Sequence, residues 1–152
     1  MFIVSGSSNL PLAQAIASAI QAPLVDIEIQ KFANGEKRVW VKGAIRGQNV
    51  TLVQSLSEPS DEHIVETLLI TDALERLGAR NVNLVMPWMG YSLQDKVFRP
   101  GEPIAAKVIA NLVSGTYIKR VFLLDLHNSS IPGFFSIPTE HLSMIDVFAE
   151  YC

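Results

Sequence analysis

The fold of this chain is decided by residues 50–86, which read VTLVQSLSEPSDEHIVETLLITDALERLGARNVNLVM. Two nearly continuous apolar runs, at 50–53 and 82–86, frame this stretch, and such runs are typical of parallel strands covered on both faces. Between them, apolar residues recur with a period of 3.6 from Ser60 to Leu77, which predicts an amphipathic helix. Gly78 follows as its C-terminal cap. Strand, helix and strand in this order predict a parallel βαβ unit.

The flanking sequence continues the alternation of strands and helices. Further strands are predicted at residues 2–4, 25–29, 39–41 and 121–124. Helices are predicted from Leu10 to Ala22 and from Ile104 to Ser114. The sequence therefore predicts an α/β domain of three layers with a mainly parallel central sheet.

The end of the chain suggests one more helix. Its apolar residues are spaced as on one face of an amphipathic helix: Leu142, Ile145, Val147, Phe148 and Tyr151.

Composition places the chain among single globular domains. It has 152 residues, of which 49% are hydrophobic, and 12 basic against 15 acidic residues give a formal charge of −3. This weak acidity argues against a protein built to bind nucleic acid. No apolar run is long enough for a transmembrane helix, so no membrane contact is expected. Cys152 is the only cysteine, which excludes an internal disulfide and a thiolate zinc site. We expect a cytoplasmic protein.

Ligands of such folds gather at the carboxyl ends of the strands, and this rule selects residues 5–9, 87–103 and 125–132. The first segment resembles a phosphate cradle at a helix N-terminus. It lacks the glycine patterns of known cradles, so a plain tight turn is favoured. The second is unusually long for a loop, which favours a function. Its Lys96 and Arg99 suit an anionic ligand, and composition alone does not separate this from a solvated surface loop.

The third segment places Asp125 and His127 directly after a buried strand. At this position the imidazole of His127 suits a metal ion or a phosphate oxygen, and a hydrogen bond to a loop carbonyl is the equal alternative. His63 and His141 are predicted in or near helices, where a structural role is favoured.

A triplet with a spacing of two stands between the strands predicted at 25–29 and 39–41. On extended backbone Phe32, Asn34 and Glu36 would point to one side. A ring, an amide and a carboxylate on one side suit an adenine, and they suit the tip of a hairpin equally well.

Together these segments resemble the ribose-phosphate pyrophosphokinase (phosphoribosyl pyrophosphate synthetase) family. The matching motifs are Phe32-Ala33-Asn34-Gly35-Glu36, Arg46-Gly47, Tyr91 with Gln94-Asp95, Glu102-Pro103-Ile104, and Asp125-Leu126-His127 with Gly133-Phe134-Phe135. The resemblance runs in order over nearly the whole chain and covers only the N-terminal half of that enzyme. It implies that residues 1–152 form an ATP-side domain of the phosphoribosyltransferase type, with the second domain absent.

The resemblance also implies the reaction. The family transfers the β,γ-diphosphoryl group of Mg-ATP to the C1 hydroxyl of ribose 5-phosphate, which gives phosphoribosyl pyrophosphate and AMP. ATP and ribose 5-phosphate are therefore the expected substrates and Mg²⁺ the expected cofactor. A homo-oligomer is implied as well, a hexamer built from dimers. Such transfer needs mostly positioning and charge neutralisation, with a metal bridging the phosphates.

Residue roles follow by matching positions. Phe32, Asn34 and Glu36 would reach from one subunit to the adenine bound mainly by its neighbour. Gln94 and Asp95 would belong to the main ATP site, with Lys96 adding positive charge. His127 would be the catalytic residue that meets the Mg-ATP phosphates and a ligand of the metal, and Arg46 would belong to a regulatory phosphate site.

Several positions depart from the family pattern. Leu93 stands where the family has an arginine beside the ATP phosphates. Loss of such a preorganised charge costs on the order of a few kcal/mol of transition-state stabilisation. Lys96 or Arg99 would compensate in part. After His127, the family's two glutamines and its aspartate are replaced by Ser130, Pro132 and Glu140.

Two readings of function follow. The first is the ATP-binding half of a ribose-phosphate pyrophosphokinase, inactive by itself because the ribose 5-phosphate loop and the catalytic Lys and Arg of the second domain have no counterpart here. The alternative is a catalytically silent homologue that assembles with active synthetase subunits and regulates them. The departures favour the silent homologue, and the retained adenine and ATP motifs favour the enzyme.

Overall fold

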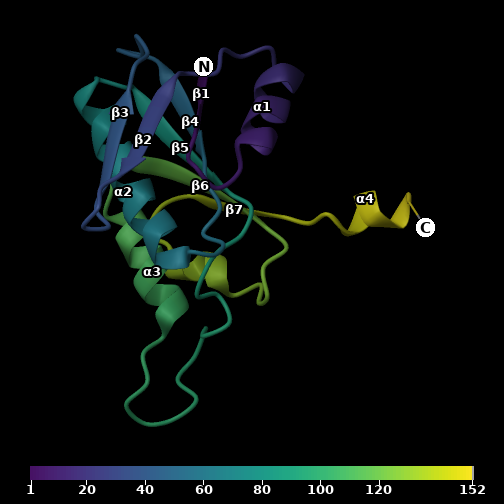
Figure 1. Cartoon of the computed structure of the whole chain (residues 1–152). Helices are drawn as coiled ribbons and strands as arrows, with labels where there is room; N and C mark the ends of the chain where they lie inside the picture. The colour runs from purple at the N-terminus through teal and green to yellow at the C-terminus, as the bar shows by residue number, and fades with distance from the viewer. Residues whose placement is uncertain (152) are drawn as a thin grey trace.

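A five-stranded sheet forms the centre of the domain (Figure 1). The computed structural model describes residues 1–151. The strands lie in the order β1 (Phe2–Ser5), β4 (Asn49–Val53), β5 (Asn81–Met86), β6 (Ile118–Leu124) and β7 (Thr139–Leu142). Each neighbouring pair is parallel, so the predicted mainly parallel sheet is confirmed.

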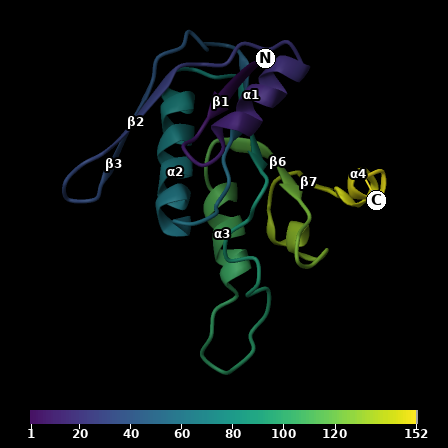
Figure 2. The same ribbon diagram turned by 45° about the vertical axis from the view of Figure 1, so that its right-hand side comes forward.

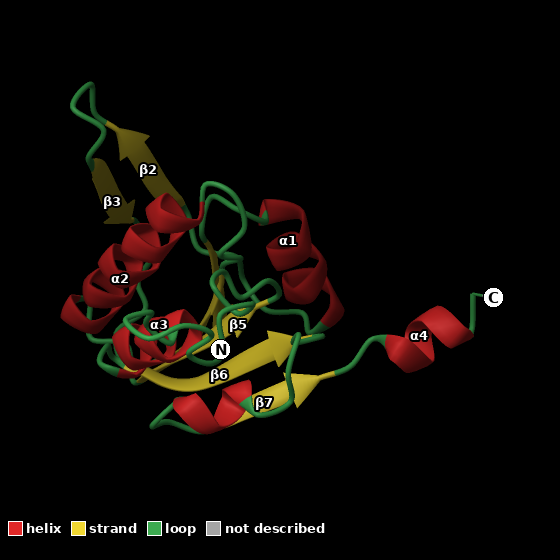
Figure 3. Cartoon of the chain, turned by 90° about the horizontal axis from the view of Figure 1, so that it is seen from below, coloured by secondary structure: helices red, strands yellow, loops and turns green. Residues whose placement is uncertain are grey.

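Helices cover both faces of this sheet and complete the three layers (Figure 3). On one face, α1 (Leu10–Ala19) packs the small residues Ala13 and Ala17 against the sheet. On the other face lie α2 (Ser60–Arg76) and α3 (Ala105–Ser114). Gly78 has the positive φ of 80° that suits a glycine just after a helix, which confirms the predicted end of α2.

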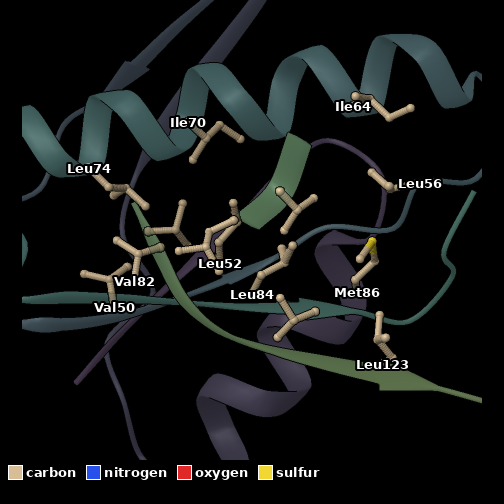
Figure 4. Packing of buried hydrophobic residues seen from close by; sticks show 14 of the residues in the cluster. Val50, Leu52, Leu56, Ile64, Ile70, Leu74, Val82, Leu84, Met86 and Leu123 are labelled. Carbon is tan, nitrogen blue, oxygen red and sulfur yellow. The ribbon is translucent and has the colours of Figure 1, made fainter. Parts of the chain in front are cut away.

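The main core lies between the sheet and α2. Side chains from β4 and β5 point toward the helix, where Ile70 and Leu74 meet them (Figure 4). The strand residues labelled there include Val50, Leu52, Val82 and Leu84, and all are fully buried. Burial of this kind contributes about 1.5–3 kcal/mol for each large apolar side chain.

Coverage of the second face is less complete than the sequence predicts. In β4, residues 50–53 are buried on both faces, as expected for a central strand. In β5 and β6, burial alternates, because Asn83, Val85 and Phe122 on the α1 side are only half-buried. The reason is that α1 lies against β1 and β4 and does not extend over the later strands.

A separate antiparallel hairpin is built from β2 (Ile27–Lys31) and β3 (Lys37–Val41). It forms no ladder with the main sheet, and β3 packs against α2. Its tip, residues 32–36, extends away from the sheet (Figure 2). The strands predicted at 25–29 and 39–41 are thus present, but β2 begins and ends two residues later than predicted and β3 begins two residues earlier, so both strands run closer to the tip than the apolar pattern indicates.

The C-terminal region differs from its prediction. Leu142 belongs to the edge strand β7, and the helix α4 (Ile145–Ala149) is a single short turn beyond it. His141 therefore lies in strand β7, four residues before α4. The preceding turn is a short 3-10 helix, η1 (Ile131–Phe134). In Figure 1, α4 projects away from the rest of the domain.

No helix within residues 1–151 combines the length and the apolar character that a membrane span requires. Cys152, on which the exclusion of a disulfide and a zinc site rests, lies outside the described residues.

Candidate functional site

The carboxyl ends of β5 and β6 bring two of the three candidate segments together. Because these strands are neighbours, the loop 87–103 and the segment 125–132 emerge side by side. They join at a hydrogen bond of 2.5 Å from the Asn128 amide to the Asp95 carboxylate. The segment 5–9 follows β1, which β4 separates from β5.

A pocket of about 190 Å³ lies where the two segments meet. Its walls come from the start of the long loop and from the end of β6: Trp88, Met89, Ser92, Leu93, Leu124, Asp125, Leu126 and His127. Leu93 is 65% exposed and stands in the wall of this pocket. The site thus combines an imidazole with a largely apolar wall.

The backbone that carries His127 is held by two side-chain contacts. Asp125 adopts a positive φ of 41°, and its carboxylate accepts a hydrogen bond from the backbone N–H of Met144 at 3.0 Å. The backbone N–H of Leu126 donates to Nε2 of His141 at 3.0 Å. Asp125 and His141 therefore shape the segment, and His127 is left exposed beside the pocket. The structural role favoured for His141 agrees with this contact.

The long loop is ordered by its own contacts. Glu102 accepts hydrogen bonds from the backbone N–H groups of Phe98 and Arg99 at 3.1 and 2.9 Å. The Lys96 ammonium lies 5.2 Å from the centre of the Phe98 ring, and Lys96 does not line the pocket beside His127. The outer part of the loop extends beyond the domain (Figure 1).

The start of the loop is tied to α2. The Tyr91 hydroxyl donates a hydrogen bond to the Asp61 carboxylate in the first turn of that helix. This bond, together with the negative charge of Asp61, raises the pKa of Tyr91 above its ordinary value. A backbone hydrogen bond also joins the loop to the first turn of α3, because the Gln94 carbonyl accepts from the backbone N–H of Ala106 at 3.1 Å.

The segment 5–9 is a tight turn whose donors are already used. The backbone N–H and the hydroxyl of Ser7 donate to the Glu66 carboxylate at 2.7 and 2.8 Å. Ser8 donates in the same way to Gln54, with its hydroxyl at 2.7 Å. A carboxylate of the chain therefore stands where a phosphate would bind, which agrees with the tight turn favoured from the sequence.

Glu66 is fully buried at the centre of this network. Besides Ser7, it accepts from Gln54 at 2.8 Å and from the Lys37 ammonium at 2.6 Å. Burial raises the pKa of Glu66, but Lys37 and the two donors of Ser7 outweigh it, so the pKa lies below its ordinary value. Gly6 is needed beside it, because a Cβ there would lie 2.0 Å from the Gln54 side-chain oxygen.

The triplet of the hairpin is not part of this pocket. Asn34 and Glu36 are joined by two hydrogen bonds. The Asn34 amide donates to the Glu36 carboxylate at 2.9 Å, and the backbone N–H of Glu36 donates to the Asn34 side-chain oxygen at 3.1 Å. Phe32 is 48% exposed. None of these three residues lines the pocket beside His127, and the tip and the long loop project from the domain at separate places in Figure 2, so any ligand of these three residues would be separate from the pocket or shared with another subunit.

Arg46 lies at the opposite end of the sheet. It precedes β4, and its side chain crosses Gly78, where an added Cβ would come within 3.4 Å of it. The neighbouring backbone is joined by a hydrogen bond of 2.7 Å from Gly47 N–H to the Gly78 carbonyl. Arg46 is exposed there and belongs to a different surface from His127.

The described part of the chain offers no metal cage of its own. Among residues 1–151, no three His, Cys, Asp or Glu side chains gather closely enough to hold an ion. Asp95 and Asp125 each accept a hydrogen bond from another residue. Mg²⁺ keeps several waters and is commonly held through substrate phosphates, so binding of this ion does not require a preformed cluster of protein ligands.

Four residues that organise the site were missed or undervalued by sequence reasoning: Gln54, Glu66, Asn128 and His141. None stands in a recognisable motif, because their partners are distant in sequence; Ser7 and Glu66, for example, are 59 positions apart. Only the position of Asn128, directly after His127, offered a signal.

Known proteins resemble this chain over nearly its whole length. Residues 1–116 match the family described as the N-terminal domain of ribose phosphate pyrophosphokinase. The chain is 42% identical over 149 residues to the ribose-phosphate pyrophosphokinase of Fusobacterium nucleatum, covering 98% of this chain and 47% of that protein. It is 41% identical over 145 residues to that of Bacillus caldolyticus, covering 95% and 46%.

Structural comparison agrees. The crystal structure of phosphoribosylpyrophosphate synthetase from Mycobacterium smegmatis superposes with a TM-score of 0.94 at 30% identity, covering 99% of this chain and 50% of that one. The chain thus spans about half the length of the relatives it matches.

Proposed function

The chain belongs to the ribose-phosphate pyrophosphokinase family, and from this premise we propose that it supplies the ATP-binding half of an enzyme that transfers diphosphate from Mg-ATP to ribose 5-phosphate. The products would be phosphoribosyl pyrophosphate and AMP. The ribose 5-phosphate site would come from the half of the relatives that residues 1–152 do not cover, so residues 1–152 by themselves should be inactive.

The observation that supports this proposal most directly is the junction of two loops at neighbouring parallel strands. The Asp95–Asn128 hydrogen bond holds the Gln94-Asp95 motif beside the segment that carries His127. The ends of parallel strands are where this class of fold binds nucleotides. His127 would contact the triphosphate, and the Mg²⁺ that neutralises it, from the exposed side of the pocket.

The hairpin tip would complete the site from another subunit. Phe32 is exposed and would stack on the adenine, while Asn34 and Glu36 would hydrogen-bond its edge. Since none of these three residues lines the pocket of its own chain, this arrangement requires a homo-oligomer, and we propose a hexamer built from dimers. Sedimentation velocity of the full-length protein would measure that assembly directly.

Nucleotide binding tests the proposal. His127→Ala should abolish measurable Mg-ATP binding by the full-length protein in calorimetry. Phe32→Ala should weaken it by about tenfold, since stacking of a base on an aromatic ring is worth ~1–3 kcal/mol. Trp40→Ala is the matched control, because Trp40 is an aromatic residue exposed on the same hairpin outside the tip. Absence of nucleotide binding by the unaltered protein would refute the proposal.

One observation favours the alternative of a silent regulatory homologue. The pocket wall carries the exposed Leu93 and no guanidinium, so a triphosphate would lose a bidentate contact there. Production of AMP from ATP and ribose 5-phosphate by the full-length protein separates the two functions. A silent homologue would produce none alone and would change the rate of an active synthetase mixed with it.

A further inference from the structure

The face of the β2–β3 hairpin that lies against α2 changes character along its length. The first two rungs on this face are apolar pairs, Ile27 with Val41 and Ile29 with Val39. These side chains pack on the main core. The third rung, next to the tip, places Lys31 opposite Lys37. Apolar packing therefore anchors the base of the hairpin and ends before the tip begins.

Two carboxylates of α2 meet this pair of lysines. The Lys31 ammonium lies 2.5 Å from Glu62, and the Lys37 ammonium lies 2.6 Å from Glu66 and 3.6 Å from Glu62. Glu62 and Glu66 are four residues apart, so they stand on one face of the helix. The Lys37–Glu66 pair is buried, with side chains 9% and 0% exposed, whereas Lys31 is 53% exposed.

These contacts determine where the tip stands. Like charges directly opposite each other destabilise a hairpin, and an isolated two-stranded hairpin is marginally stable at best. The side-chain bonds of Asn34 and Glu36 within the tip join only these two residues to each other. The ion pairs to α2 are thus the side-chain links between the tip end of the hairpin and the domain, and Glu66 extends them to the turn at Ser7.

We propose that Lys31 and Lys37 are positioning residues, which through Glu62 and Glu66 hold the hairpin at the angle where Phe32, Asn34 and Glu36 meet an adenine nucleotide bound by the neighbouring subunit. This inference rests on the proposed function. It assigns to both lysines an effect on base recognition and none on the triphosphate.

The test compares two ligands of the full-length protein, Mg-ATP and inorganic Mg-tripolyphosphate, in calorimetry. Lys31→Gln and Lys37→Gln should each weaken ATP binding by about fivefold, because a displaced tip loses part of the stacking and hydrogen bonding of the base. Neither variant should change the binding of tripolyphosphate. Lys31→Arg should restore ATP binding, because it keeps the pair with Glu62. If Lys37→Gln fails to fold, the exposed Lys31→Gln carries the test.

Lys42→Gln is the matched control. The Lys42 ammonium pairs with Glu28 at 3.1 Å near the base of the same hairpin, so the loss of this ion pair should change the affinity for neither ligand. If the lysine variants bind Mg-ATP and Mg-tripolyphosphate more weakly to the same extent, the effect is one of general charge. If Phe32→Ala lowers the affinity for Mg-ATP but the lysine variants do not, the lysines do not position the tip. Either result overturns the inference and leaves the proposed function standing. If Phe32→Ala itself has no effect, the adenine contact and the inference fail together.

Discussion

The side-chain amide of Asn128 donates a hydrogen bond to the carboxylate of Asp95, and this bond joins the loops that follow β5 and β6 across 33 residues of sequence. It holds the two most distinctive motifs of the chain at one edge of the sheet. The candidate ATP site therefore depends on a polar contact that neither motif contains by itself.

Removal of this contact should weaken nucleotide binding more than it weakens the fold. Asn128→Ala leaves Asp95 without its partner at a half-exposed position, and we expect ATP affinity to fall about five- to tenfold, as for the loss of one hydrogen bond of ~1–1.5 kcal/mol. Calorimetry gives the affinity and urea unfolding the stability. Asn81→Ala is the control, since it removes an exposed amide pair with Asn49. Equal ATP affinities for Asn128→Ala and the control would contradict the prediction.

Leu93→Arg should restore a positive charge at the pocket beside His127. A guanidinium there would meet triphosphate oxygens in a bidentate way, and we expect ATP to bind about tenfold more tightly, corresponding to ~1.4 kcal/mol. The gain should shrink with rising salt. Leu93→Gln, which is polar but uncharged, is the control. A variant that binds ATP no better than Leu93→Gln would place the triphosphate elsewhere.

Gly6→Ala should destabilise the domain by about 1–3 kcal/mol, as overpacking of a tight interior does. The new Cβ would lie 2.0 Å from the Gln54 oxygen, and Gln54 is buried and bonded to both Ser8 and Glu66. The midpoint of urea unfolding measures the loss. Gly133→Ala should leave the midpoint nearly unchanged, because no atom lies within 4 Å of a Cβ there.

Acid should act on the domain through Glu66. Its pKa is lower in the folded state than in the unfolded chain, because Lys37 and Ser7 outweigh the effect of burial. The stability it contributes is therefore present above its unfolded pKa of about 4.3 and is lost as pH falls through the folded value. The free energy of unfolding should decline less steeply below about pH 5 in Glu66→Gln than in the unaltered protein.

Urea unfolding at a series of pH values measures this slope, and Glu140→Gln, which removes an exposed carboxylate paired with Arg120, serves as its control. Identical slopes for Glu66→Gln and the unaltered protein would show that another group governs the acid response.

Much of the fold is predictable from the sequence because its signals are local. The apolar runs at 50–53 and 82–86 and the helical period between them depend only on neighbouring residues, and the parallel βαβ unit follows from them. The edge strand at 139–142 escaped prediction because it is short and mostly exposed, so it carries no apolar alternation.

The candidate site is predictable only in part. The rule of strand ends selects three segments, but it does not say which strands are neighbours. The structure brings residues 87–103 and 125–132 together and places residues 5–9 beside β4, where Glu66 uses the donors of the turn.

The sequence by itself determined the α/β class, the helix and strand pattern of the central unit and the motifs shared with the family, since each depends on residue types at short spacing. The tertiary structure alone decided the strand order, the burial of Glu66 with Lys37 and the separation of the hairpin tip from the pocket beside His127. These features depend on which residues, distant in the chain, reach the same hydrogen-bond donors and cover the same apolar surface. These long-range contacts are fixed only when the whole domain packs.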